Sequence, residues 1–133
     1  MADELRVPIN SDADIVTARQ KGRALAEQVG FSGSELALIA TAISELARNI
    51  VEFAGHGEIL LSTCQQKDRR GVTIVARDEG PGIPDVSLAL QDGYSTRGGL
   101  GLGLPGARRL MDEFEIQSEA GKGTTITARK WKQ

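Results

Sequence analysis

Two glycine clusters in the second half of the chain constrain its fold more than any other feature. Gly80 and Gly82 lie in the run Asp78–Pro84, and the second cluster reads G-G-L-G-L-G-L-P-G over Gly98–Gly106. Glycine has no Cβ and tolerates positive φ, so a backbone there can approach a ligand closely. The second cluster runs into a predicted helix, whose first N–H groups attract phosphate, so the pair predicts a nucleotide site. Two ordinary turns are the alternative interpretation.

The composition is typical of a single-domain protein. The chain has 133 residues, enough for one domain over 1–133, and a net charge of −2 with both signs interspersed. This pattern predicts no nucleic-acid surface and no polybasic membrane patch. With one cysteine, Cys64, and one histidine, His56, it argues against a disulfide framework, a metal cluster and a Ser-His-Asp triad. We find no signal core or membrane span, and expect a cytoplasmic protein.

The spacing of apolar residues predicts two long helices in the first half. Leu5–Ile9 first alternates like a short edge strand. Ser11 then starts a helix that Gly30 ends, and Ser32 starts a second helix that Gly55 ends.

The remaining elements alternate between strands and helices. The predicted strands are Glu58–Gln65, Gly71–Asp78, Phe114–Ser118 and Thr124–Trp131, the predicted helix is Leu102–Glu113, and Asp85–Gln91 and Gly93–Arg97 are a helical turn and a polar loop. The strands form two hairpins, since each pair has a short connection. Hairpins with segregated helices predict an α+β fold, a two-layer sandwich.

Glu45 and Asn49 lie one turn apart on the polar face of the second predicted helix and project together. The carbonyl oxygen of asparagine is a suitable ligand for Mg²⁺, which takes few protein ligands and fills its other positions with water and phosphate oxygens. A glutamate beside it could accept a proton from an attacking hydroxyl or water. A solvated helix face is the alternative interpretation of such a pair.

Asp78 ends an apolar run and is predicted at a strand terminus. A carboxylate there can accept a hydrogen bond from the exocyclic amine of adenine, whereas guanine places a carbonyl at that position. Thr124 could return to the base through its hydroxyl. A turn carboxylate and an ordinary strand threonine are the alternatives. Gly101–Gly106 also matches G-x-G-x-x-G, but it follows a polar loop rather than a strand, which argues against a dinucleotide fold.

Four motifs in order resemble the Bergerat-fold (GHKL) ATPases, a superfamily of gyrase, chaperone and mismatch-repair ATPases and histidine kinases. The motifs are Glu45-x-x-x-Asn49, Asp78-x-Gly80-x-Gly82, Gly99-x-Gly101-x-Gly103 and Gly123-Thr124. The resemblance implies ATP and Mg²⁺ as cofactors, with Mg²⁺ at Asn49, adenine at Asp78 and phosphates along the second glycine cluster. The predicted cofactor-binding residues are Asn49, Asp78, Gly80, Gly82, Arg97, Gly98, Gly99, Leu100, Gly101, Leu102, Gly103 and Thr124. For Arg97, contact with the γ-phosphate and a plain surface position remain alternatives.

Three longer stretches resemble more narrowly the RsbT-type stressosome switch kinases, a group related to anti-sigma kinases. They are T-A-I-S-E-L-A-R-N over Thr41–Asn49, the run Asp92–Gly106, and R-L-M-D-E-F over Arg109–Phe114. The resemblance implies a protein serine/threonine kinase, with Glu45 as its catalytic base. Such kinases phosphorylate STAS-domain partners, leave them, and then activate a phosphatase or other output protein. An ATP-gated regulator of the anti-sigma type and a plain ATP hydrolase are the alternative functions.

Overall fold

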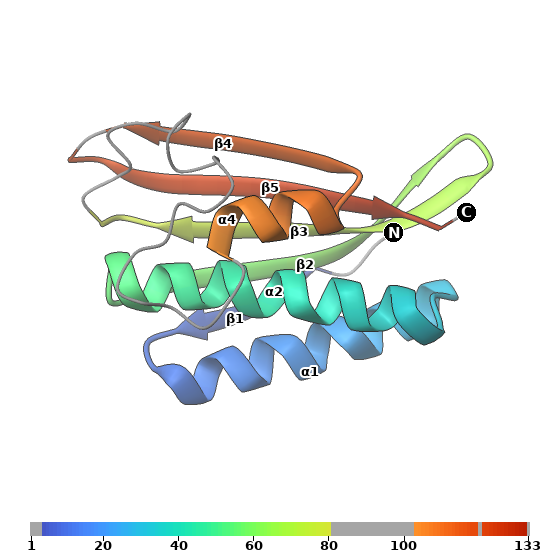
Figure 1. The fold of residues 1–133 in the computed structure, drawn as a ribbon, viewed down its shortest axis with the longest axis horizontal. Coiled ribbons are helices and arrows are strands. Elements are labelled where there is room, and N and C mark those ends of the chain that lie inside the picture. Colours follow the sequence, from blue (N-terminus) through green and yellow to red (C-terminus); the bar gives the residue numbers. More distant parts are fainter. Residues whose placement is uncertain (1–3, 81–102, 120, 133) are drawn as a thin grey trace.

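A five-stranded antiparallel sheet carries helices on one face (Figure 1). In this computed structural model the described residues are 4–80, 103–119 and 121–132. Their elements are β1 (Leu5–Ile9), α1 (Asp12–Val29), α2 (Gly33–Phe53), β2 (Gly57–Gln66), β3 (Arg69–Asp78), α4 (Gly103–Leu110), β4 (Glu113–Glu119) and β5 (Gly123–Trp131). The α+β two-layer sandwich predicted from the sequence is confirmed.

The strand order is β1-β2-β3-β5-β4, so the C-terminal strand β5 lies between β3 of the first hairpin and β4, its own hairpin partner. This order brings Asp78, the last residue of β3, opposite Thr124 of β5 and Gly57 of β2. β1 is an edge strand, as predicted, and its Pro8 removes no ladder hydrogen bond from the sheet interior. The register thus places the end of β3 between the starts of two neighbouring strands.

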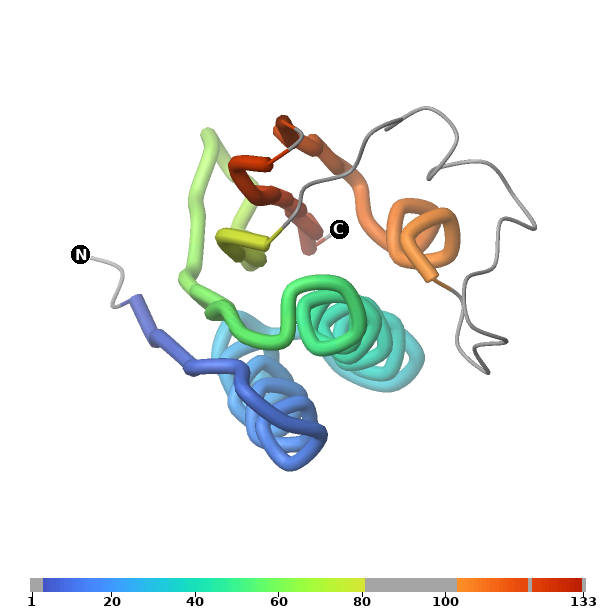
Figure 2. Tube along the Cα trace, turned by 90° about the vertical axis from the view of Figure 1, so that its left-hand side faces the viewer, coloured from blue at the N-terminus to red at the C-terminus, as the bar shows by residue number. Residues whose placement is uncertain are grey.

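The core lies between the sheet and the helices, which all cover the same face in the end-on view of Figure 2. Alternate residues in the middle of β2 and β3 point into it, including Ile59, Leu61 and Ile74. The central helix α2 supplies Ile39 and Ile43, which are fully buried. Each such side chain contributes roughly 1.5–3 kcal/mol by leaving water. Among the described helices, none combines the length and the apolar character needed to cross a membrane.

Three of the four predicted helix ends are confirmed, and α2 ends at Phe53 with Ala54 as its C-cap, one residue before the predicted Gly55. Ser11 is the N-cap of α1, and its backbone N–H donates to Asp14 at 3.2 Å. Gly30 ends α1 in the left-handed region at φ 117°, where glycine has no steric penalty. Ser32 is the N-cap of α2.

The structure differs from the sequence prediction at α4 and at the first hairpin. α4 ends at Leu110, three residues before the predicted Glu113, because Asp112 joins the sheet: its N–H donates to the Arg129 carbonyl at 2.9 Å and its carboxylate accepts the Trp131 N–H at 2.7 Å. The first hairpin is longer than predicted, with a turn at Lys67 of φ 54°. The elements expected at Asp85–Gln91 and Gly93–Arg97 lie outside the described residues.

Candidate nucleotide site

Asp78 and Thr124 face each other at one end of the sheet. The side chain of Thr124 is buried, at 5% exposure. Gly123, before it, has φ 99°, and a Cβ there would lie 2.2 Å from the Asp78 carbonyl oxygen. Only glycine therefore lets β5 pass this close to Asp78. The Gly123-Thr124 motif and the strand-end aspartate thus lie side by side in the fold.

An open cavity of about 480 Å³ lies against this pair. Its lining includes Asp78 and Thr124, and it also includes Ser118 of β4 and Lys122 of the β4–β5 turn. Ser118 Oγ lies 2.8 Å from Thr124 Oγ1 and 3.2 Å from the Gly123 carbonyl oxygen. Carboxylate and hydroxyl groups in a cavity wall are usual means by which a pocket orients a small molecule.

Gly80 supports Asp78 from the other side. Its backbone N–H donates to Asp78 Oδ1 at 2.9 Å. A Cβ on Gly80 would lie 2.6 Å from the Cβ of Ala54 at the end of α2. The first glycine motif therefore brings the chain past the helix and fixes one oxygen of the aspartate.

Glu45 joins the two helices that cover the phosphate end of the predicted site. Its side chain is buried, at 6% exposure. Its Oε1 accepts the backbone N–H of Gly103 at 2.7 Å, and its Oε2 accepts a hydrogen bond from the Arg48 guanidinium at 2.7 Å. Gly103 is the first residue of α4 and the last glycine of the predicted phosphate motif. The carboxylate therefore lies where that motif begins its helix.

Asn49 lies one turn after Glu45 on the same face of α2 and is half-buried. The structure thus brings together Glu45, Asn49 and Gly103 at one end, and Asp78, Gly80 and Thr124 at the other. The other predicted site residues are Gly82, Arg97, Gly98, Gly99, Leu100, Gly101 and Leu102, which lie outside the described residues.

Two residues of this site were missed by the sequence interpretation, Arg48 and Ser118. Arg48 lies three residues after Glu45, a spacing that puts both on one helix face. Ser118 is the register partner of Thr124 across the second hairpin. Helix spacing and hairpin register can both be read from a sequence, so the place of both residues beside the site could have been predicted.

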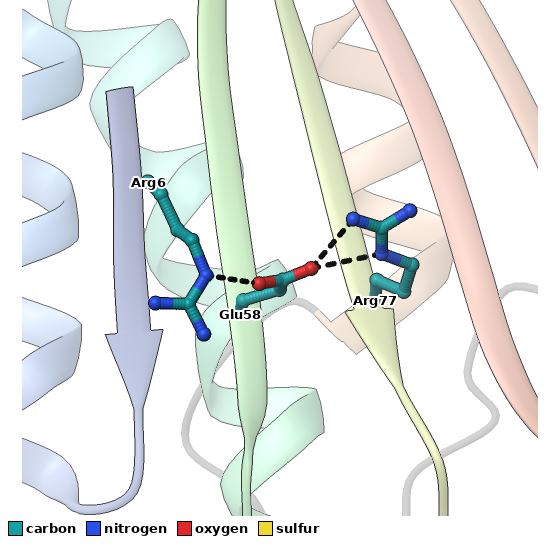
Figure 3. A network of polar contacts seen from close by, with 3 residues as sticks. All are labelled: Arg6, Glu58 and Arg77. Atoms are coloured by element: carbon teal, nitrogen blue, oxygen red, sulfur yellow. Dashed lines mark hydrogen bonds and ion pairs between the residues drawn. The ribbon is translucent and has the colours of Figure 1, made fainter. Parts of the chain in front are cut away.

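A row of charged residues crosses the other face of the sheet beside Asp78 (Figure 3). Glu58 of β2 accepts two hydrogen bonds from Arg77 of β3, at 2.9 and 2.6 Å, and one from Arg6 of β1. The hydrogen bonds from Arg77, and after them that from Arg6, hold the pKa of the Glu58 carboxyl below its ordinary value. These side-chain contacts link β1, β2 and β3 near the end of β3.

Comparison with known proteins identifies the family. A family model described as the histidine kinase-like ATPase domain matches residues 10–130. The chain belongs to this family. It is also 52% identical over 131 residues to the serine/threonine-protein kinase RsbT of Bacillus subtilis (strain 168), and the match covers 98% of each chain. Within the histidine kinase-like ATPases it therefore groups with the RsbT-type serine/threonine kinases, which confirms the resemblance and the enzyme class predicted from its motifs.

Two further matches are more distant. An anti-sigma F factor of Caldanaerobacter subterraneus subsp. tengcongensis is 35% identical over 119 residues, covering 86% of this chain and 82% of that protein. The crystal structure of the RsbU and RsbW domains of a Mycobacterium tuberculosis protein matches with a TM-score of 0.61 at 23% identity. That match covers 98% of this chain and 31% of the longer one, and shows the fold alone.

Proposed function

We propose that this RsbT-type kinase uses ATP and Mg²⁺ to phosphorylate a serine or threonine of a STAS-domain partner in the cytoplasm. Phosphorylation releases the partner, and the freed kinase then activates an output protein such as a phosphatase. One observation carries the proposal: the buried carboxylate of Glu45 accepts the N–H of Gly103 at the end of the glycine motif. This contact brings the predicted base to the predicted phosphate site. The 52% identity to RsbT supports the same activity.

The base end of the site fits adenine. The cavity has Asp78 and Thr124 on its wall, and the Asp78 carboxylate offers an acceptor for an amine. A cavity of about 480 Å³ also lies within the ordinary range for small-molecule sites. Because Gly80 holds Oδ1 of Asp78 in place, the carboxylate is oriented before a nucleotide binds.

The phosphate end fits Mg²⁺ and a triphosphate. Asn49 offers a neutral oxygen ligand one turn from Glu45, which suits an ion that takes its other ligands from phosphate and water. Bound Mg²⁺ would supply charge neutralisation on the transferring phosphoryl group. In the first turn of α4 the Gly103 N–H is bound by Glu45 and Pro105 has no N–H, so an anion there would rely on the N–H groups of Leu104 and Gly106.

Glu45 is held in a fixed position for proton transfer. Each of its oxygens accepts one hydrogen bond, from Gly103 and from Arg48, and a carboxylate oxygen can accept more than one. In this proposal the carboxylate takes the proton of the substrate hydroxyl as the hydroxyl oxygen attacks. Positioned bases of this kind contribute roughly 10²–10⁴ in rate.

The proposal is tested by phosphotransfer to a candidate partner. Incubation with γ-labelled ATP and an unmodified STAS-domain protein should label a serine or threonine of that protein. A phosphate adds nearly two negative charges at the contact, close to Glu45, so affinity for the partner should fall after phosphorylation. The output protein should then compete with unmodified partner for the kinase. Equal affinity for the partner before and after phosphorylation would show that the kinase does not release its partner by phosphorylating it.

A second function is favoured by the similarity to anti-sigma F factors. In this alternative the chain is a binding regulator whose affinity for its partner depends on ATP, with little turnover. ATP-dependent partner binding without labelling of the partner would favour the regulator over the switch kinase.

A further inference from the structure

Two contacts of Ser118 bear on the direction of the hydroxyl hydrogen of Thr124. Ser118 Oγ lies 3.2 Å from the Gly123 carbonyl oxygen and 2.8 Å from Thr124 Oγ1. A carbonyl oxygen can only accept, so the one hydroxyl hydrogen of Ser118 is directed to Gly123. Both contacts are then hydrogen bonds only if Thr124 donates to Ser118. The burial of Thr124, at 5% exposure, limits its exchange of this bond for water.

We infer that Ser118 is a positioning residue that makes Thr124 a hydrogen-bond acceptor toward the nucleotide base. With its hydrogen directed to Ser118, the Thr124 hydroxyl has only lone pairs to offer to the cavity. Asp78 presents a carboxylate, which also accepts. Two polar side chains of the cavity wall therefore call for a donor on the ligand. This inference rests on the proposed use of ATP and extends it to the choice of base.

An exocyclic amine on the purine can donate a hydrogen bond to these acceptors, and a carbonyl cannot. Adenine carries N–H donors at its sixth position, whereas hypoxanthine and guanine carry an oxygen there. The wrong base would set its oxygen against the acceptors of Asp78 and Thr124, which is the kind of mismatch that gives strong discrimination. Removal of the Ser118 hydroxyl would free the Thr124 hydrogen to rotate and donate to that oxygen. Ser118→Ala should therefore weaken selection against the carbonyl base rather than abolish nucleotide binding.

The test compares the affinities of ATP and ITP, which differ at the sixth position of the purine and in the hydrogen that ITP carries on N1. The wild-type chain should prefer ATP. Ser118→Ala should narrow the ATP/ITP affinity ratio by about fivefold to tenfold, the effect expected of one hydrogen bond. Ser118→Thr keeps the hydroxyl and should restore the ratio. Ser62→Ala removes a half-buried serine from β2, away from the cavity lining, and should leave the ratio unchanged.

A double-mutant cycle separates positioning from a general structural effect. In a Thr124→Val background no hydroxyl remains for Ser118 to orient, so adding Ser118→Ala should change the ATP/ITP ratio no further. A further change in that background would overturn the inference, as would an unchanged ratio in Ser118→Ala alone. Thermal melting confirms that each variant is folded. If the wild-type chain binds neither nucleotide, both the proposed function and this inference are wrong. ATP binding with a ratio insensitive to Ser118 overturns the inference alone.

Discussion

The two ends of the candidate site are built in different ways. At the base end, strands place the polar groups: Asp78 and Thr124 are register partners, and Ser118 pairs with Thr124 across a hairpin. At the phosphate end, one side chain joins two helices, because Glu45 of α2 accepts the N–H of Gly103, 58 residues away. The base end follows from sheet register, whereas the phosphate end depends on how α4 packs beside α2, with the Glu45–Gly103 hydrogen bond between them.

This difference predicts different consequences of mutation. Several hydrogen bonds of the sheet fix each group at the base end, so a substitution there should alter nucleotide affinity or choice and leave the rest of the site in place. A substitution of Glu45 removes a proton acceptor and also a cap of α4, so chemistry and structure change together. The phosphate end is therefore where one residue has the larger effect.

The largest expected effect comes from Glu45. Glu45→Gln keeps a carbonyl oxygen that can accept the Gly103 N–H, but it cannot take a proton, so phosphotransfer should fall roughly 10²–10⁴-fold while ATP binding is retained. Glu45→Ala should show the same loss and lower stability as well, because it leaves the Gly103 N–H without its acceptor. Single-turnover labelling, equilibrium ATP binding and thermal melting measure the three quantities.

The control for Glu45 is Glu35→Gln, in the first turn of the same helix. It removes one carboxylate from α2 far from Gly103, and should leave the rate unchanged. A normal phosphotransfer rate in Glu45→Gln would disprove the role of Glu45 as the base.

The close approach of Gly123 to Asp78 predicts the next largest effect, at the base end. Gly123→Ala would place a Cβ 2.2 Å from the Asp78 carbonyl oxygen, in addition to the strain of φ 99°. Gly121→Ala is the matched control: it has a similar φ of 80° but open space around the added Cβ. We expect about 1 kcal/mol of destabilisation from Gly121→Ala and about 2–4 kcal/mol from Gly123→Ala. Denaturant unfolding measures both, and equal losses would refute the packing argument.

Asp78→Asn tests base choice with a smaller change. The amide oxygen can still accept the Gly80 N–H, but the charged acceptor is lost. ATP affinity should fall about 10–100-fold, because hydrogen bonds to charged groups contribute about 1.5–3 kcal/mol. The preference for ATP over GTP should narrow as well. Titrations with both nucleotides measure this, and identical curves for ATP and GTP in the wild-type chain would rule out base recognition by Asp78.

The sequence predicted those parts of the fold that depend on neighbouring residues. The caps at Ser11 and Gly30 and the stripes of α1 and α2 are local patterns, and each was placed correctly. The end of α4 was wrong because Asp112 is held by β5, a contact that no helix propensity encodes.

At the candidate site, too, the sequence predicted individual motif residues but not the contacts that depend on packing. Motif order identified Asp78 and Thr124, and the sheet brings them together. The contact between Glu45 and Gly103 was not predicted, since it depends on how α4 packs beside α2. Ser118 was also missed, although its pairing with Thr124 follows from the hairpin register once the turn is placed.

The smallest expected effect comes from the charged row that braces β1, β2 and β3 beside the base end. Because Arg77 and Arg6 lower the pKa of Glu58 in the folded chain, folding favours the ionised carboxylate. Its contribution is fully present above the ordinary glutamate pKa near 4.5 and is lost as the pH falls through the lower folded value. Glu58→Gln should therefore cost about 0.2–1 kcal/mol at pH 7, less at high salt, and nothing once the pH is well below 4. Urea unfolding between pH 3 and 7 measures the difference, with Glu27→Gln at an exposed position of α1 as the control. A cost that stays constant across this range would show that Glu58 acts by packing and not by charge.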